Sequence, residues 1–191
     1  MIQRNEIESV LSEGLALIKD ATLRQKVVDA YMLAVKEGGW TSMKDLLEMP
    51  FTLLTETHGI NFFEHTLAVT RGAIGLAKGQ METYKKMPYP VDFDRLAAGG
   101  LLHDVGKLVE SERKADGTWK KSRKGEYARH PISGAIFCAK VGLPDDIVNT
   151  VACHAKEGEG APKVLETVLI HQADFATFDP LVMLSKGQLI V

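Results

Sequence analysis

The stretch that decides the fold spans residues 99–107 and reads GGLLHDVGK. It places an imidazole, His103, directly before a carboxylate, Asp104, inside a segment whose apolar spacing is helical. This helix can be capped by Asp92 or Asp94. Along one of its faces the sequence places Leu96, Gly100, His103 and Lys107. A histidine on such a face is either a hydrogen-bonded core residue or a metal ligand, so the rest of the sequence is needed to distinguish the two.

Helical spacing continues on both sides of this stretch. Near the N-terminus, apolar side chains at steps of three and four form two stripes, over 7–18 and 23–35, which predict two antiparallel helices. Further helices are expected over 61–78, from His130, from about 145 and over 162–178. Alternation of apolar and polar residues is confined to a hairpin-like piece near Asp116 and Gly117. We therefore expect an all-α fold.

The composition is that of an ordinary globular chain of 191 residues, of which 45% are hydrophobic and 25% are charged. The formal net charge of -2 argues against a uniformly basic nucleic-acid-binding protein. No apolar run approaches the roughly 18 residues of a membrane span, and the N-terminus lacks a signal-peptide pattern, so we expect a cytoplasmic location. Cys138 and Cys153 lack a C-x-x-C spacing and are expected to be small buried apolar residues.

Histidines and carboxylates recur on the inner faces or at the ends of the predicted helices. The set consists of His65, His103, Asp104, His130, His154 and Asp174. Imidazoles and carboxylates without thiolates suit divalent ions such as Mn, Fe, Co, Ni, Zn or Mg, with coordination positions left open. Any one of these residues alone is weak support for a metal site, because buried histidines are common without one. Six of them together are harder to explain as core residues.

The string from Gly99 to Lys107 resembles the signature of the HD superfamily of metal-dependent phosphohydrolases, which are all-helical. The family order is a first His, then His-Asp, then in some members two more His, and finally an Asp. This sequence presents the same order as His65 in FFEHTLAV, His103-Asp104, His130 in ARHPISGA, His154 in VACHAKEG and Asp174 in HQADF. The resemblance covers about Asn61 to Asp179 and implies an HD-domain helical bundle with the N-terminal helices packed on it. We expect an N-terminal segment over 1–50 and the HD domain over 51–191, together forming one structural domain.

The resemblance also implies a binuclear centre in which Asp104 bridges two divalent ions. One ion would be held by His65, His103, Asp104 and Asp174, and the other by Asp104, His130 and His154. Two ions are expected because the one-metal members of the family lack the two middle histidines. Paired ions would polarise a phosphoryl oxygen, turn a bridging water into hydroxide and stabilise the charge that develops in an in-line displacement. Lys107 resembles the family lysine near the phosphate, so Asp104 and Lys107 are the expected catalytic residues. The alternative for Lys107 is an exposed lysine at a helix end.

Two departures from the family narrow the subclass. HD-GYP cyclic-dinucleotide phosphodiesterases carry Gly-Tyr-Pro after their later histidines, whereas residues 157–162 read EGEGAP here. Asn61 stands where some of those enzymes place a glutamate for a third metal, so a trinuclear site is not expected. The glycine-rich loop after His154 and the HQAD of residues 171–174 are more similar to HD exoribonucleases and their relatives. The helical N-terminus leaves no room for the separate nucleic-acid-binding module that those exonucleases usually carry.

Residues 113–129 are locally basic, with seven Lys or Arg against two acidic residues and hence a net charge of +5. This segment joins the His-Asp pair to His130, so its cations could attract a phosphorylated substrate. The expected substrate-binding residues are Lys107, Lys120, Lys121, Arg123, Lys124 and Arg129. Trp119 and Tyr127 could add base stacking. The alternative is a solvated linker whose aromatic side chains pack locally.

The expected function is a divalent-metal-dependent phosphohydrolase that acts on a nucleotide-type phosphodiester or phosphomonoester through a metal-bridging hydroxide. The alternatives are a non-catalytic HD module that binds a nucleotide or metal for regulation, and a purely structural helical domain. The expected partner is a phosphorylated small molecule, a nucleotide or a short oligonucleotide, with no membrane. His171 is expected either to orient Asp174 without binding metal or to pack. The oligomeric state stays open, because the apolar residues 181–184 and 189–191 could form either core or interface.

Overall fold

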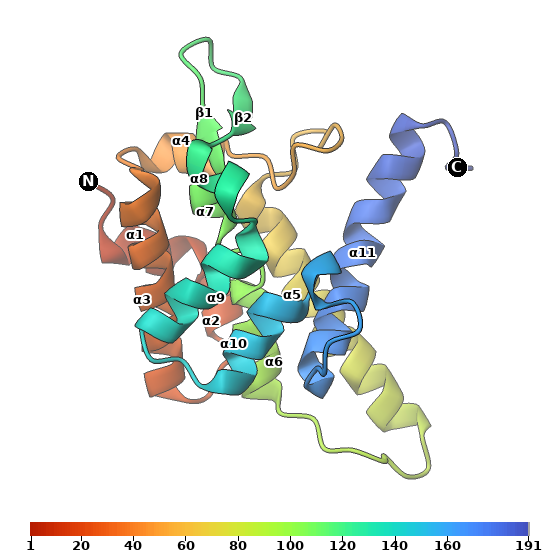
Figure 1. The fold of residues 1–191 in the computed structure, drawn as a ribbon. Coiled ribbons are helices and arrows are strands. Elements are labelled where there is room, and N and C mark those ends of the chain that lie inside the picture. Colours follow the sequence, from red (N-terminus) through yellow and green to blue (C-terminus); the bar gives the residue numbers. More distant parts are fainter. Residues whose placement is uncertain (191) are drawn as a thin grey trace.

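Nearly all regular structure in the computed structural model, which describes residues 1–190, is helical (Figure 1). The α-helices are α1 (Arg4–Val10), α2 (Ser12–Leu15), α3 (Ala21–Gly38), α4 (Met43–Leu47), α5 (Phe62–Thr83), α6 (Phe93–Leu102), α7 (Lys107–Glu110), α8 (Arg123–Tyr127), α9 (His130–Lys140), α10 (Asp145–Cys153) and α11 (Leu165–Ser185). A short 3-10 helix, η1 (Lys156–Gly158), follows α10. Two short strands, β1 (Ser111–Arg113) and β2 (Trp119–Lys121), form an antiparallel hairpin. The predicted all-α fold is confirmed.

Helix α6 lies at the centre of the bundle because two glycines let its neighbours come close. A Cβ at Gly100 would lie 2.8 Å from Thr70 Oγ1 of α5, and a Cβ at Gly99 would lie 2.9 Å from Thr150 Cγ2 of α10. Helix α11 packs along α5 and also contacts α6. Gly99 and Gly100 therefore allow close helix packing on two sides of α6. This packing places the chain that follows α6 inside the bundle.

The N-terminal helices cover one side of this bundle. Helix α3 packs against α6, α7 and α9, and the hydroxyl of the buried Tyr31 donates a hydrogen bond to the carbonyl of Leu101, at 2.6 Å. The indole of Trp40 likewise donates to the carbonyl of Leu108, at 2.6 Å. The predicted helix over 7–18 is not continuous, because the chain divides into α1 and α2 at Leu11. The packing of these helices on the bundle agrees with the prediction, while the division at residue 50 stays a prediction.

The second difference from the sequence prediction lies at the His-Asp pair. The predicted helix through Lys107 ends at Leu102, and residues 103–106 form a turn before α7 begins. Within this turn the amide of Lys107 donates to the carbonyl of Asp104, at 2.8 Å. A Cβ at Gly106 would collide with the carbonyl of His130, so the turn packs directly on the start of α9. The break brings two distant segments of the candidate site together.

The hairpin that was expected near Asp116 and Gly117 projects from the helical body (Figure 1). Gly117 has a φ of 83°, a left-handed conformation that glycine adopts without strain. Trp119 does not offer a free face for a base, because its ring lies 5.8 Å from that of Trp40 and beside the guanidinium of Arg113. Trp119 therefore packs locally, which was the alternative prediction for it. Tyr127, by contrast, is 78% exposed.

The remaining sequence predictions concern the chain ends, the cysteines and membrane spans. Helix α5 extends beyond residue 78 and α11 beyond residue 178, to Ser185. Cys138 is buried, which raises the pKa of its thiol to about 12, and Cys153 is half-buried. In the described part of the chain, no helix combines the length and apolarity needed to cross a bilayer. Val191, the last residue of the apolar tail and of the predicted HD domain, lies outside the described residues.

Candidate metal centre

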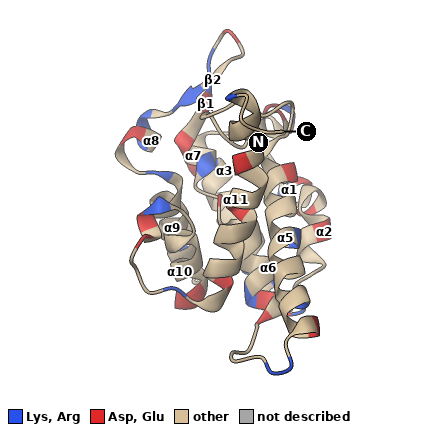
Figure 2. Cartoon of the chain, turned by 90° about the vertical axis from the view of Figure 1, so that its right-hand side faces the viewer, with Lys and Arg blue, Asp and Glu red and all other residues tan. Residues whose placement is uncertain are grey.

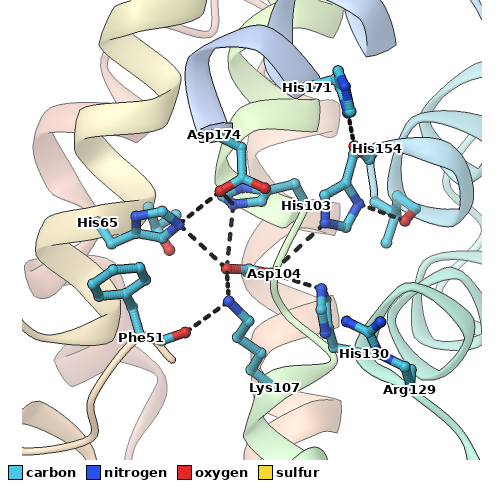
Figure 3. Close-up of polar contacts among 12 residues, drawn as sticks. Phe51, His65, His103, Asp104, Lys107, Arg129, His130, His154, His171 and Asp174 are labelled. Atoms are coloured by element: carbon cyan, nitrogen blue, oxygen red, sulfur yellow. Dashed lines mark hydrogen bonds and ion pairs between the residues drawn. The ribbon is translucent and has the colours of Figure 1, made fainter. Parts of the chain in front are cut away.

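Six side chains from five segments meet around Asp104 (Figure 3). His65 lies in the first turn of α5, His103 and Asp104 in the turn after α6, His130 at the start of α9, His154 at the end of α10 and Asp174 within α11. The structure thus brings together every residue of the predicted ligand set. Five of these residues are buried, and the side chain of Asp174 is 16% exposed.

The two oxygens of Asp104 face two different groups of ligand-type atoms. Asp104 Oδ2 lies 3.5 Å from His65 Nε2 and 3.3 Å from His103 Nε2. Asp174 Oδ1 joins this first group, at 3.1 Å from His65 Nε2. Asp104 Oδ1 lies on the other side, 3.1 Å from His130 Nε2 and 3.7 Å from His154 Nε2. The division into two groups that share Asp104 is the arrangement expected for two neighbouring cations.

The hydrogen bonding of these atoms tests whether the cluster suits a cation. Among residues 1–190, six buried side-chain nitrogen or oxygen atoms have no hydrogen-bond partner. Five of them belong to this cluster, namely Nε2 of His65, His103 and His154 and both carboxylate oxygens of Asp104. Buried polar atoms are normally paired, since leaving one unpaired costs about 1–3 kcal/mol. Coordination to divalent cations would satisfy these nitrogen and oxygen atoms, so the residues present fit such a group.

All four imidazoles are held through their other ring nitrogen. His103 Nδ1 lies 2.6 Å from the carbonyl of Gly100, and His154 Nδ1 lies 2.8 Å from that of Val151. His130 Nδ1 lies 2.7 Å from Glu110 Oε2, and His65 Nδ1 lies 3.3 Å from Thr177 Oγ1. In neutral rings that donate from Nδ1, Nε2 is free to accept a cation. Such fixed tautomers are typical of metal-binding histidines.

Glu110 and Phe51 belong to the surroundings of the centre, although no sequence pattern pointed to either residue. Glu110 Oε2 accepts from the backbone amide of His130, at 2.8 Å, as well as contacting its ring. Burial would raise the pKa of Glu110, but the hydrogen bonds and charge of His130, together with the nearby Lys121, outweigh it and lower the pKa. The ring of Phe51 stacks on that of His65, with centroids 4.1 Å apart. Neither contact follows a helical spacing, because each joins different segments of the fold.

Lys107 points into the centre and is not an exposed lysine at a helix end. Its Nζ lies 2.6 Å from Asp104 Oδ2 and donates to the carbonyl of Phe51, at 2.7 Å. Only 16% of its side chain is exposed. The ammonium is therefore fixed at the boundary between the candidate metal groups and the solvent-accessible side of the centre.

The electrostatics of the centre favour ionised carboxylates. Burial would raise the pKa of Asp104, but the positive charge of Lys107 and the neighbouring imidazoles His103 and His130 outweigh it and hold the pKa well below its usual range. Burial acts on Asp174 in the same direction, but the neighbouring His65, His103 and Lys107 together outweigh it and lower the pKa. Burial also lowers the pKa of His130, which favours the neutral ring that binds metals.

His171 is placed differently from the expectation that it orients Asp174. Its Nδ1 lies 2.6 Å from the backbone carbonyl of His154, and its ring lies beside Phe175, with centroids 4.6 Å apart. The side chain therefore ties α11 to the end of α10 (Figure 3). It supports the segment that carries His154, and no contact with the Asp174 carboxylate is found among the described residues.

The basic segment is largely paired with acidic side chains away from the centre. Lys120 lies 2.8 Å from Glu112, and Lys124 lies 3.0 Å from Glu37. Arg123 lies over the ring of Tyr127. Figure 2 shows these cations spread over the hairpin and α8. Of the expected substrate-binding residues, Lys107, Lys121 and Arg129 line a cavity beside His130, and the other three do not.

Comparisons with known proteins identify the family of the segment that carries this centre. Residues 62–176 match the sequence profile of the HD domain. The chain is 28% identical over 163 residues to dihydroneopterin 2',3'-cyclic phosphate phosphodiesterase of Methanocaldococcus jannaschii, which covers 83% of this chain and 64% of that protein. It is also 30% identical over 118 residues to ribonuclease Y of Pseudothermotoga lettingae, and 29% identical to that of Thermotoga maritima, covering 62% of this chain and 18% of each. The chain thus spans less than two thirds of the length of these relatives. No solved structure matches it significantly.

Proposed function

The chain belongs to the HD domain family, and from that premise we propose that it is a divalent-metal-dependent hydrolase of a nucleotide-type phosphodiester. The observation that carries the proposal is the cluster of five buried ligand-type atoms without hydrogen-bond partners around Asp104. Two similar proteins are named a phosphodiesterase and a ribonuclease, which supports a diester over a phosphomonoester. A regulatory module without activity is the alternative, and the complete set of ligand-type residues favours an enzyme.

The proposed ligand set follows the two sides of Asp104. His65, His103, Asp104 and Asp174 would hold one divalent ion, and Asp104, His130 and His154 would hold the other. When bound, such ions supply Lewis acidity that polarises a phosphoryl group and lowers the pKa of water. These six residues come from five segments of the fold that meet around Asp104, which supports a centre that is arranged before any substrate arrives.

The other residues of the centre act on the substrate and on the ligands. Lys107 presents a fixed ammonium at the edge of the centre, where it can contact a phosphoryl oxygen and offset negative charge. Glu110 and Thr177 hold the rings of His130 and His65 in the orientation that directs Nε2 inward. Phe51 covers His65 and excludes water from that side of the cluster.

The test is hydrolysis of bis(p-nitrophenyl) phosphate after removal of metals with a chelator and addition of Mn2+. Wild type should regain turnover with the metal, and Asp104→Ala should not. Asp116→Ala, at the exposed tip of the hairpin, is the matched control and should behave as wild type. Full activity of Asp104→Ala would contradict the proposal. A wild-type protein that takes up Mn2+ and binds nucleotides without turnover would favour the regulatory module.

A further inference from the structure

A cavity of about 340 Å³ opens beside the candidate metal centre. Its inner edge is formed by His130 and Lys107, and both of these side chains contact Asp104. Small-molecule sites typically measure about 300–1,000 Å³, so this cavity lies near the lower limit. Its size suits a molecule like a mononucleotide better than an extended chain.

One wall of the cavity is apolar and consists of residues 51–54, which read FTLL. Leu53 is 42% exposed and Leu54 is 79% exposed, so neither contributes much to the core. The segment is anchored beside the centre, because the carbonyl of Phe51 accepts from Lys107. A further anchor is the hydrogen bond from the amide of Phe62 to the carbonyl of Met49, at 2.8 Å. Exposed leucines on an anchored wall can pack against a flat ring.

The other wall is cationic and contains Lys121 and Arg129. Their acidic neighbour in the cavity is Glu110, whose Oε1 lies 3.6 Å from Lys121 Nζ and 4.0 Å from Arg129 Nε. Arg129 also contacts Glu157 at the rim, at 3.2 Å. Glu110 already accepts two hydrogen bonds from His130, so its charge is shared and the two cations keep donors for another anion. Lys120, the neighbour of Lys121 on β2, lies on the opposite face of that strand and pairs with Glu112 of β1.

We propose that this cavity binds the non-reacting part of a small phosphodiester, with a flat ring against Leu53 and Leu54 and a second anionic group at Lys121 and Arg129. The inference rests on the proposed function, because it places the scissile phosphate at Lys107 and the metal centre. Both walls and Lys107 line the same cavity, so one molecule can contact all three. The substrate class is then a mononucleotide-sized phosphodiester that carries an additional phosphate or carboxylate, and not a long RNA.

The test uses adenosine 3',5'-bisphosphate and adenosine 3'-monophosphate as probes, since neither contains a diester bond. Isothermal titration calorimetry on the Mn2+-loaded protein should show at least about 10-fold tighter binding of the bisphosphate. Lys121→Ala should abolish this preference, and Lys120→Ala, the neighbour on the other face of β2, should retain it. Leu54→Ala should weaken the binding of both probes several-fold. Leu76→Ala, which changes an exposed leucine of α5, should leave their binding unchanged.

The outcomes separate the cavity from the catalytic proposal because binding is measured without turnover. Unchanged Kd values in both Lys121→Ala and Leu54→Ala would overturn the cavity assignment, even in an active enzyme. On the metal-free protein, which should not turn over, tighter binding of a ten-nucleotide oligoadenylate than of the bisphosphate would also overturn it, in favour of RNA. Binding as expected, in a protein that hydrolyses no phosphodiester, would contradict the proposed function and support the cavity.

Discussion

Two clusters of charged groups lie in this molecule, and they differ in whether their buried atoms form hydrogen bonds. The first is the centre around Asp104. The second lines a larger cavity, of about 700 Å³, at the N-terminal ends of α3, α6 and α10, with the buried Glu166 behind it. Glu166 accepts from the amide of Asp92, at 3.0 Å, and from Arg95, at 3.4 Å, while Arg95 also contacts Asp146, at 2.9 Å.

From this difference we infer that the second cluster serves the fold and that the centre around Asp104 serves chemistry. In the second cluster each oxygen of Glu166 has a protein partner, and Asp94 accepts from the amides of Lys19 and Asp20, at 2.8 Å each. These acidic groups cap helix starts and join segments, which is a sufficient reason for their presence. Around Asp104 five buried atoms form no hydrogen bond. Burial is more complete there than in the second cluster, where Arg95 is 31% exposed and Asp146 is 30% exposed. Cavity size alone would have selected the wrong region.

The largest expected effect is that of Asp104→Ala. Addition of Mn2+ to chelator-treated wild type should raise Tm, because an ion present at 100 times its Kd stabilises the folded state by about 2.7 kcal/mol. The variant should lose this shift, and its turnover should fall at least about 1,000-fold, since several kcal/mol of transition-state stabilisation is lost. Differential scanning calorimetry with and without Mn2+ measures the shift. An undiminished shift in the variant would remove the distinction between the two clusters.

Glu110→Gln should weaken metal binding with little effect on folding. The amide cannot hold the ring of His130 as the carboxylate does, and loss of such a partner typically reduces metal affinity by about 10- to 100-fold. Calorimetric titration with Mn2+ gives the Kd. Glu112→Gln, on the exposed side of the hairpin, is the control and should bind as wild type. Equal Kd values for the two variants would mean that Glu110 does not support the centre.

Glu166→Ala should have the opposite profile, with reduced stability and unchanged metal binding. It removes the partner of Arg95 and of the Asp92 amide, and because Arg95 is 31% exposed the expected loss is about 1–2 kcal/mol. Urea denaturation of the metal-free protein measures this loss. The Mn2+-induced rise in Tm should persist in the variant. A variant that keeps its stability but loses the rise would assign the second cluster to function.

Asp94→Ala should show the smallest effect, a loss of about 1 kcal/mol in the free energy of unfolding. The carboxylate is partly exposed and binds two backbone amides near the start of α3, as a helix cap does. Urea denaturation again provides the measurement, with Asp116→Ala as an exposed control. A loss as large as that of Glu166→Ala would show that burial matters less in this cluster than we infer.

The candidate ligands, which the structure brings together, could be selected from the sequence because that information is carried by ordered residue types. His65, His103-Asp104, His130, His154 and Asp174 could be recognised without knowing their distances. Glu110 and Phe51 could not, since their contacts arise only when α7 packs near α9 and when the segment before α5 folds over His65. Spacing along one helix says nothing about such neighbours.

Charges and helix ends were harder to predict for a related reason. The sequence shows a basic segment, but Glu37, which pairs with Lys124, and Asp45, which pairs with Arg113, are far away in the chain. Apolar spacing continues through residues 103–106, so it predicts one helix where close packing of Gly106 against α9 requires a turn. Tertiary contacts overrode local preference at both places.

We infer that five buried atoms around Asp104 form no hydrogen bond because they bind divalent ions. The most direct measurement is the Mn2+ content of the protein, by inductively coupled plasma mass spectrometry, after reconstitution and gel filtration of wild type and Asp104→Ala. We expect two ions per wild-type chain and fewer than one per variant chain. A wild-type protein that retains no metal, or a variant that retains as much as wild type, would contradict the account.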